Sequence, residues 1–230
     1  MISTKSADFK FIDRGKQRSI VLIPGWATDY RIFNSLDIEF NYLIPLVFSP
    51  FTFYRSLLSA LEENQLQKVS LFGWSLGGFL AFEFAAKQAD FIDELILVGI
   101  RRKYSKAEIE KVKASLRKSK KACLYKFYSQ CFYDKEQKLN FKKAYLKDYC
   151  RKLELDFLIE GLDYLVNAQL PIRELEKIKK LTIIHGEFDN IAPIQEAIDI
   201  KISLAHAKFV LIKDAGHLPF LREGFKQYII

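Results

Sequence analysis

The chain has 230 residues, of which 50% are hydrophobic and 28% are charged, so it can bury one sizeable core. This composition excludes an intrinsically disordered chain, and the low content of glycine (10) and proline (6) excludes a collagen-like one. The net charge of +8 comes from 36 Lys and Arg against 28 Asp and Glu.

Short apolar runs alternate with helical patterns through the first hundred residues. Nearly continuous apolar runs are typical of strands that are covered on both faces, as in a parallel sheet. They predict strands at residues 19–24, 42–48, 68–72 and 95–99. Apolar residues at helical spacing predict helices at 30–36, 53–64 and 76–88. This alternation predicts an α/β fold with a mostly parallel central sheet flanked by helices.

The pattern changes between residue 104 and about residue 170, where many lysines accompany apolar residues at helical intervals and no strand is indicated. Strand and helix then alternate again, with strands predicted at 181–185 and 208–212 and helices at 193–204 and 220–228. We therefore expect an α/β core made of residues 1–100 and 171–230. Residues 101–170 are expected to form a helical cap inserted into this core.

The basic residues are concentrated in this insertion. Residues 101–152 contain 18 Lys and Arg against 5 Asp and Glu, a balance of +13, so the rest of the chain sums to −5. A cationic surface favours an acidic partner, although a lysine-rich solvated helix face has the same composition. A nucleic-acid partner is disfavoured, because no recognised binding motif accompanies the lysines.

A G-x-S-x-G element, Gly73-Trp74-Ser75-Leu76-Gly77, joins a predicted strand to a predicted helix. In this context a sharp turn lifts the serine hydroxyl out of the fold, and glycines let the backbone pack closely around it. Ser75 is therefore the candidate nucleophile. The alternative interpretation is a glycine-rich turn that only packs a helix on the sheet.

A nucleophilic serine needs a base and an acid. His217 lies in a loop after the last predicted strand, where a Ser-acid-His order places the base, whereas His185 ends a strand and His206 lies in a polar connection. Asp189, in the loop before the helix that begins near Pro193, is the first choice for the acid, with Glu187 of the same loop as the alternative.

Two backbone N–H groups are expected to hold the oxyanion. One belongs to Leu76, because it follows the nucleophile at a helix N-terminus. The other belongs to the loop after the strand at 19–24, where Pro24 has no N–H and Trp26 is the expected donor. Ala27 is the alternative if Trp26 is not the donor.

These motifs together resemble a known superfamily. The strand followed by PGW, the GWSLGG element, the G-x-x-D loop and the terminal AGH-x-PF are similar to the α/β-hydrolases, and within them to the pimeloyl-[acyl-carrier protein] methyl ester esterases of biotin synthesis. The resemblance also covers Phe127 and Gln130, which match a substrate-contacting segment of that family's cap. Pro24 and the shortened stretch at 48–52 depart from the family's pattern.

The resemblance implies a serine carboxylesterase that uses no cofactor or metal and hydrolyses a methyl ester on a pimeloyl chain carried by acyl carrier protein. Because carrier proteins are acidic, five lysines of the insertion are expected to dock this partner: Lys121, Lys126, Lys138, Lys142 and Lys143. The alternatives are a broad short-chain carboxylesterase or thioesterase, a C–C bond hydrolase, and a ligand-binding protein without activity.

The chain is expected to be a cytoplasmic monomer. Its three cysteines (Cys123, Cys131 and Cys150) are odd in number and have no Cys-x-x-Cys pairing, which argues against a disulfide framework or a zinc site. No apolar run approaches the length of a membrane span, and the first residues lack the apolar stretch of a signal peptide.

Overall fold

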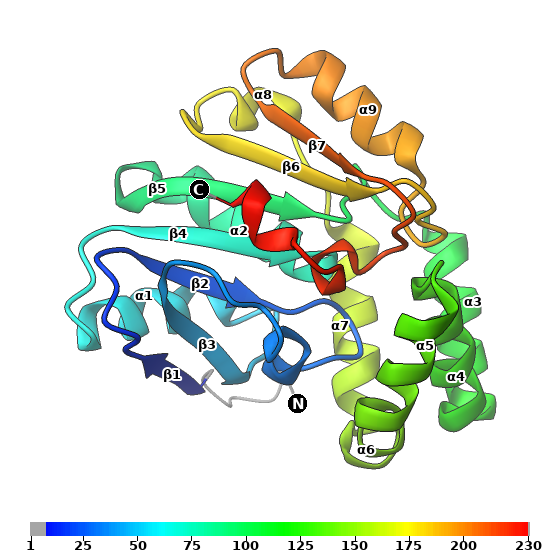
Figure 1. Cartoon of the computed structure of the whole chain (residues 1–230). Helices are drawn as coiled ribbons and strands as arrows, with labels where there is room; N and C mark the ends of the chain where they lie inside the picture. Colours follow the sequence, from blue (N-terminus) through cyan, green and yellow to red (C-terminus); the bar gives the residue numbers. More distant parts are fainter. Residues whose placement is uncertain (1–7, 230) are drawn as a thin grey trace.

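A computed structural model describes residues 8–229 and shows one twisted sheet in the strand order β1-β3-β2-β4-β5-β6-β7 (Figure 1). The first strand, β1, runs antiparallel to β3, and every other neighbouring pair is parallel. The strands are β1 Asp8–Ile12, β2 Ser19–Ile23, β3 Asn41–Val47, β4 Val69–Trp74, β5 Ile92–Val98, β6 Leu181–Gly186 and β7 Lys208–Ile212.

Strands β2, β4 and β6 are buried at every residue, as expected for strands whose two faces are both covered. Helices α1 and α2 contact each other behind the sheet, and α9 packs on β6 (Figure 1). The helices that connect the strands are α1 Phe53–Glu63, α2 Leu76–Lys87, α8 Ile172–Leu175 and α9 Ile194–Ser203. The prediction of an α/β fold with a mostly parallel sheet is confirmed.

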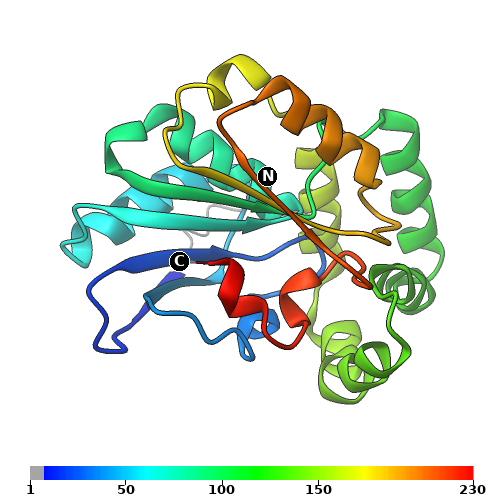
Figure 2. The same cartoon turned by 45° about the horizontal axis from the view of Figure 1, so that its top comes forward.

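Between β5 and β6 the chain forms a purely helical segment, apart from one isolated bridge between Lys103 and Gln169. These helices gather beside the carboxyl ends of the parallel strands, at the right in Figures 1 and 2. They are α3 Lys106–Lys118, α4 Lys120–Cys131, α5 Lys135–Phe141, a π-helical turn Lys142–Leu146, α6 Lys147–Lys152 and α7 Leu155–Asn167. We call residues 101–170 the insertion.

Two predicted helices are wrong in type. The segment at 30–36 forms only a 3-10 turn, Tyr30–Phe33, which Asp29 caps through its side chain. The segment at 220–228 forms two 3-10 turns, Pro219–Leu221 and Phe225–Tyr228, in front of the sheet (Figure 2). Gly224 separates these turns at a φ of 74°, a left-handed conformation that a continuous helix cannot contain.

The strand β1 was not predicted. It is a short edge strand with a bulge at its start, and its side chains are exposed or half-buried rather than buried, so it lacks the continuous apolar pattern of the inner strands. Phe9 packs on Phe53 of α1, so the strand covers that helix although its own outer edge is open. The strand that was predicted at 95–99 begins earlier, at Ile92, and ends before Gly99.

Candidate active site

Ser75 lies at the sharp turn between β4 and α2. Its backbone has a φ of 55° and a ψ of −116°, a strained conformation that a non-glycine residue keeps only when its surroundings enforce it. A Cβ at Gly73 would stand 2.4 Å from the Gly77 carbonyl oxygen, and a Cβ at Gly77 would stand 2.2 Å from the Ile23 carbonyl oxygen. The two glycines therefore permit the close packing that forms the turn.

The N-terminus of α2 lies directly after this serine. Leu76 is the first helical residue, and the first N–H groups of an α-helix have no partner within the helix. The Gly78 N–H donates to the Ser75 carbonyl oxygen at 2.9 Å, which fixes the first turn. The Leu76 N–H is thus positioned beside the nucleophile at the positive end of a helix dipole.

His217 and Asp189 form a buried pair. The distance between His217 Nδ1 and Asp189 Oδ2 is 2.7 Å, and both side chains are fully buried. Asp189 Oδ1 accepts hydrogen bonds from the N–H groups of Ile191 and Ala192, each at 2.8 Å. These bonds hold the carboxylate so that its other oxygen faces the imidazole, an arrangement that fixes the ring's tautomer.

The His217 ring is held against the strand that leads to the nucleophile. The Trp74 indole N–H donates to the His217 carbonyl oxygen at 2.7 Å, and the two rings lie 5.4 Å apart. The His217 N–H donates to the Cys131 carbonyl oxygen at 2.8 Å, at the end of α4. His217 Nε2 is buried and has no hydrogen-bond partner among residues 8–229.

The ionised form of Asp189 is favoured in the folded chain. Burial raises the pKa of Asp189, but the charge and the hydrogen bond of His217, together with His185 and the Ala192 N–H, outweigh burial, so this pKa lies below its ordinary value of 3.8. A lowered carboxyl pKa stabilises the folded state above the unfolded pKa, and this stabilisation is lost as the pH falls through the folded pKa.

We therefore expect Asp189→Asn to lower the free energy of unfolding more at neutral pH than at about pH 3.5. At the lower pH the carboxylate of the unfolded wild type takes up a proton more readily than that of the folded wild type, so the wild type loses part of the stability that its folded carboxylate provides. Urea denaturation of both proteins across this range measures the difference. A difference that is independent of pH would contradict the lowered pKa.

The alternative acid and bases make other contacts, although His185 Nε2 also lies 3.6 Å from Asp189 Oδ2. Glu187 accepts a hydrogen bond from the Asp214 N–H at 3.2 Å and forms neither a hydrogen bond nor an ion pair with His217. His185 is buried, with Nε2 at 2.7 Å from the Ala192 carbonyl oxygen, and burial lowers its pKa. His206 is exposed and its Nε2 lies 3.1 Å from the Ile178 carbonyl oxygen. The structure thus pairs His217 with Asp189 rather than with Glu187.

The loop that contains Trp26 contacts the nucleophile. A Cβ at Gly25 would stand 3.2 Å from the Ser75 Cβ and 2.8 Å from the Trp74 ring. The Trp26 indole N–H donates to the Leu158 carbonyl oxygen at 2.8 Å, and its ring meets Phe127 edge-on at 4.8 Å. Trp26 therefore connects the core loop to helices α4 and α7.

A cavity of about 300 Å³ extends from Ser75 into the insertion, between α3, α4 and α7. Trp26, Phe127, Gln130 and Lys126 line it together with Ser75, so the structure brings these predicted residues to one place. The other four predicted lysines do not line it. Its apolar lining comes mainly from the insertion: Ile109, Val112, Leu162 and Leu165.

Sequence reasoning missed Arg101 and Tyr104, which also line the cavity. The Arg101 guanidinium lies over the Tyr104 ring, 4.5 Å from its centroid. Burial raises the pKa of Tyr104 to about 12, although the neighbouring Ser75 hydroxyl acts in the opposite direction. A neutral phenol therefore lies beside the nucleophile at ordinary pH. The available signal was their position just after β5, because ligands bind at the carboxyl ends of parallel strands.

The sheet order, the strained turn at Ser75 and the buried Asp189–His217 pair together define the fold of this chain as the α/β-hydrolase fold. Solved structures show the same fold. The esterase EaEST from Exiguobacterium antarcticum matches with a TM-score of 0.81 at 18% identity, covering 96% of this chain and 93% of that one. The enol-lactonase from Burkholderia xenovorans LB400 matches with a TM-score of 0.77 at 18% identity, covering 93% and 90%.

Curated relatives share one name. The pimeloyl-[acyl-carrier protein] methyl ester esterase of Legionella pneumophila (strain Paris) is 25% identical over 226 residues, which cover 90% of each chain. The esterase of the same name from Vibrio atlanticus (strain LGP32) is 21% identical over 235 residues, with 91% of each chain covered. No protein-family model matches the chain. The predictions of an α/β-hydrolase fold and of a similarity to these esterases are confirmed.

Among residues 8–229, no helix combines the length and the apolar character that crossing a bilayer requires.

Proposed function

We propose that the chain is a serine carboxylesterase in which Ser75, His217 and Asp189 form the catalytic triad. One observation carries this proposal: the Asp189–His217 pair leaves a buried imidazole nitrogen without a protein partner, next to the strand that presents Ser75. A base that is oriented by a carboxylate and still has a free nitrogen is what an unactivated serine needs.

The reaction follows from these groups. The Ser75 hydroxyl oxygen attacks the acyl carbon as His217 Nε2 takes its proton, and the N–H groups of Trp26 and Leu76 stabilise the oxyanion. The C–O bond to the alcohol breaks as His217 returns the proton to the leaving oxygen. Water, deprotonated by His217, then attacks the acyl-enzyme and releases the carboxylic acid and free Ser75.

We propose a methyl ester of a pimeloyl chain on acyl carrier protein as the substrate, because the curated relatives carry that name. The cavity supports an acyl substrate, since its walls beyond Ser75 are mostly apolar and come from three helices of the insertion. We also propose that the insertion acts as a cap over this substrate and that the enzyme works in the cytoplasm. The three free thiols support that location.

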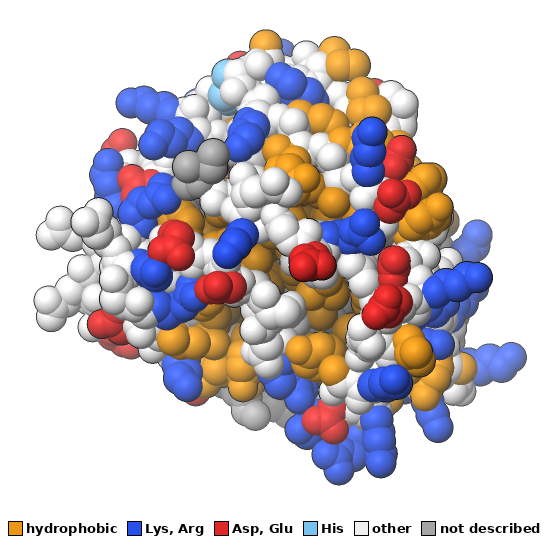
Figure 3. Space-filling model, viewed as in Figure 1, with side chains coloured by type: hydrophobic (Ala, Val, Ile, Leu, Met, Phe, Trp, Pro, Cys, Tyr) orange, Lys and Arg blue, Asp and Glu red, His pale blue; other side chains and the backbone are white. Residues whose placement is uncertain are grey.

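The charge of the insertion supports an acidic partner. Lys and Arg side chains gather over α4, α5 and α6, at the lower right of Figure 3. The five proposed docking lysines make no ion pair with any residue from 8 to 229, and three of them are exposed: Lys121, Lys126 and Lys143. Unpaired surface cations of this kind accelerate association with an anionic protein at low salt.

Reversing Lys121, Lys142 and Lys143 to Glu should raise KM for the carrier-bound methyl ester and leave p-nitrophenyl butyrate hydrolysis unchanged. These lysines lie outside the cavity, so the change removes steering of a charged partner without altering the acyl pocket. Steady-state kinetics with both substrates, at low salt and at about 0.15 M salt, measure the effect, and salt should imitate the mutations.

A matched control makes the same charge change at the amino ends of the parallel strands, away from the insertion at their carboxyl ends. Lys177, Lys179 and Lys180 are exposed and lie just before β6, and their reversal to Glu should not affect either substrate. Equal effects of the two triple variants would refute docking on the insertion.

The second candidate function is that of a broad short-chain carboxylesterase. The solved structures of the same fold include an esterase whose name does not mention acyl carrier protein. Relative kcat/KM for the carrier-bound methyl ester and for p-nitrophenyl acetate decides between the two. A preference for the acetate would be compatible with the proposed triad but would refute the proposal that the substrate is bound to a carrier protein.

A further inference from the structure

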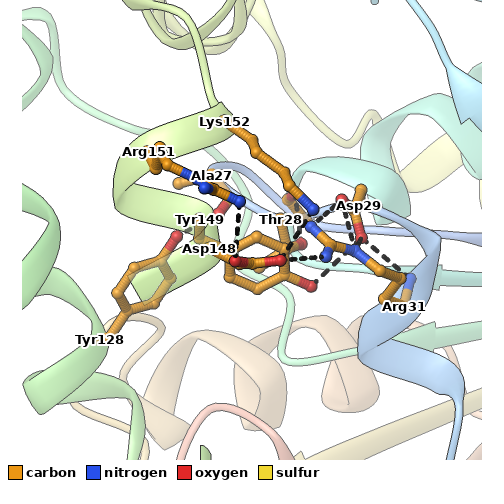
Figure 4. A network of polar contacts seen from close by, with 10 residues as sticks. Ala27, Thr28, Asp29, Arg31, Tyr128, Asp148, Tyr149, Arg151 and Lys152 are labelled. Atoms are coloured by element: carbon orange, nitrogen blue, oxygen red, sulfur yellow. Dashed lines mark hydrogen bonds and ion pairs between the residues drawn. The ribbon is translucent and has the colours of Figure 1, made fainter. Parts of the chain in front are cut away.

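The loop after β2, residues 24–31, is connected to the insertion at several points, and we call it the β2 loop. Figure 4 shows these connections, in which side chains of α4 and α6 reach residues 27–31 of the loop. The loop also holds Trp26, the proposed oxyanion donor. Elements far apart in the sequence therefore meet at a backbone segment on which the proposed reaction depends.

Tyr128 of α4 holds one side of the loop. Its hydroxyl donates a hydrogen bond to the Ala27 carbonyl oxygen, and its ring is buried against Phe141 and Tyr149. Burial raises the pKa of Tyr128 well above its ordinary value, so the hydroxyl keeps the proton that it donates. Ala27 has a φ of 60°, a left-handed conformation that an alanine keeps only when its neighbours enforce it.

Thr28 fixes the peptide group on the other side of Trp26. Its buried hydroxyl donates to the Gly25 carbonyl oxygen at 3.0 Å. Because a peptide group is planar and trans, the Gly25 carbonyl and the Trp26 N–H point in opposite directions. Fixing that carbonyl therefore fixes the direction of the Trp26 N–H.

Ion pairs hold the C-terminal end of the β2 loop. Arg31 forms ion pairs with Asp29 at 2.8 Å and with Asp148 of α6 at 3.1 Å. The Tyr149 hydroxyl donates to Asp29 Oδ1 at 3.3 Å, and the Arg31 guanidinium lies over the Tyr149 ring at 5.1 Å. The insertion thus contacts the loop beyond Ala27 as well as at Ala27.

We propose that Tyr128 is a positioning residue for ester hydrolysis: by holding the Ala27 carbonyl it keeps the β2 loop in the strained conformation that directs the Trp26 N–H at the oxyanion. The inference rests on the proposed esterase function and extends it. Tyr128 acts through the backbone, so it affects the transition state more than the bound substrate, whose carbonyl carries less negative charge.

Tyr128→Phe tests this inference because it removes the hydroxyl and keeps the ring. We expect kcat for p-nitrophenyl butyrate to fall between about tenfold and about 10²-fold with KM unchanged, as for a misplaced catalytic group. The affinity for butyl trifluoromethyl ketone should fall by a similar factor, because this inhibitor forms an oxyanion on Ser75.

Tyr145→Phe is the matched control. The Tyr145 ring stacks on Tyr149 at 5.8 Å, within the same aromatic cluster, and its hydroxyl makes no hydrogen bond to the described residues. It should retain wild-type kcat and inhibitor affinity. Thr28→Val tests the other side of Trp26 and should lose kcat as Tyr128→Phe does, whereas Thr28→Ser, which keeps a hydroxyl, should recover most of that loss.

The failure of the positioning role and the failure of the esterase function give different results in these experiments. Unchanged kcat and inhibitor affinity in Tyr128→Phe would overturn the positioning role, and so would a rise in KM alone, which would make Tyr128 a wall of the acyl pocket. If Tyr128→Phe fails to fold by circular dichroism, equal kcat in Thr28→Val and Thr28→Ser would overturn it instead. An inactive wild type would refute the esterase function.

Discussion

Ser75→Ala should reduce kcat for ester hydrolysis by about 10⁶-fold, and His217→Ala should reduce it to a similar extent. The two groups act as a unit, so the loss of either one removes activation of the nucleophile, and the double variant should be hardly worse than either single one. Initial rates with p-nitrophenyl butyrate measure the losses. Labelling with a fluorophosphonate probe, which needs the activated serine, should disappear together with activity.

Ser70→Ala is the matched control for this loss. Ser70 lies in β4 five residues before the nucleophile, and its hydroxyl is buried without a partner among the described residues, so its removal should leave kcat and labelling intact. Substantial activity in a folded Ser75→Ala protein would end the serine-hydrolase interpretation.

Asp189→Asn should reduce kcat by about 10⁴-fold while changing KM little. An amide keeps the size of the side chain, but its NH₂ group favours the wrong imidazole tautomer, so Nε2 of His217 no longer accepts the serine proton. The 2.7 Å contact between Asp189 and His217 is the structural basis of this expectation.

Glu187→Gln supplies the comparison, because Glu187 is in the same loop and contacts the Asp214 N–H instead of the imidazole. It should keep near wild-type kcat. The reverse result, with Glu187→Gln inactive and Asp189→Asn active, would make Glu187 the acid.

Much of this fold could be predicted because buried parallel strands have a strong sequence pattern. Strand β7 matches its predicted bounds of 208–212, and α1 and α2 differ from theirs by one residue at the end. The weakest local patterns failed. An edge strand such as β1 has one open side, and a 3-10 turn such as Tyr30–Phe33 has helical spacing without the length of a helix.

The site was predictable where chemistry is tied to local motifs. The turn at Ser75 follows from the glycines around it, and the order of the chain was enough to select His217 and Asp189 as a pair. Arg101 and Tyr104 follow no motif, because their place in the cavity wall depends on how the helices of the insertion pack around it. The contact between Tyr128 and Ala27 joins residues 101 positions apart, which no local pattern indicates.

The hydrogen bond from the His217 N–H to the Cys131 carbonyl ties the insertion to the core at the proposed base. At Gly216, a Cβ would stand 2.5 Å from the same carbonyl oxygen, so the two backbones are already in contact. A minimal enzyme made by deleting residues 101–170 would therefore lose part of the support of its histidine along with its acyl pocket. A cap segment grafted onto this core from another protein must therefore place a hydrogen-bond acceptor where the Cys131 carbonyl oxygen accepts from the His217 N–H.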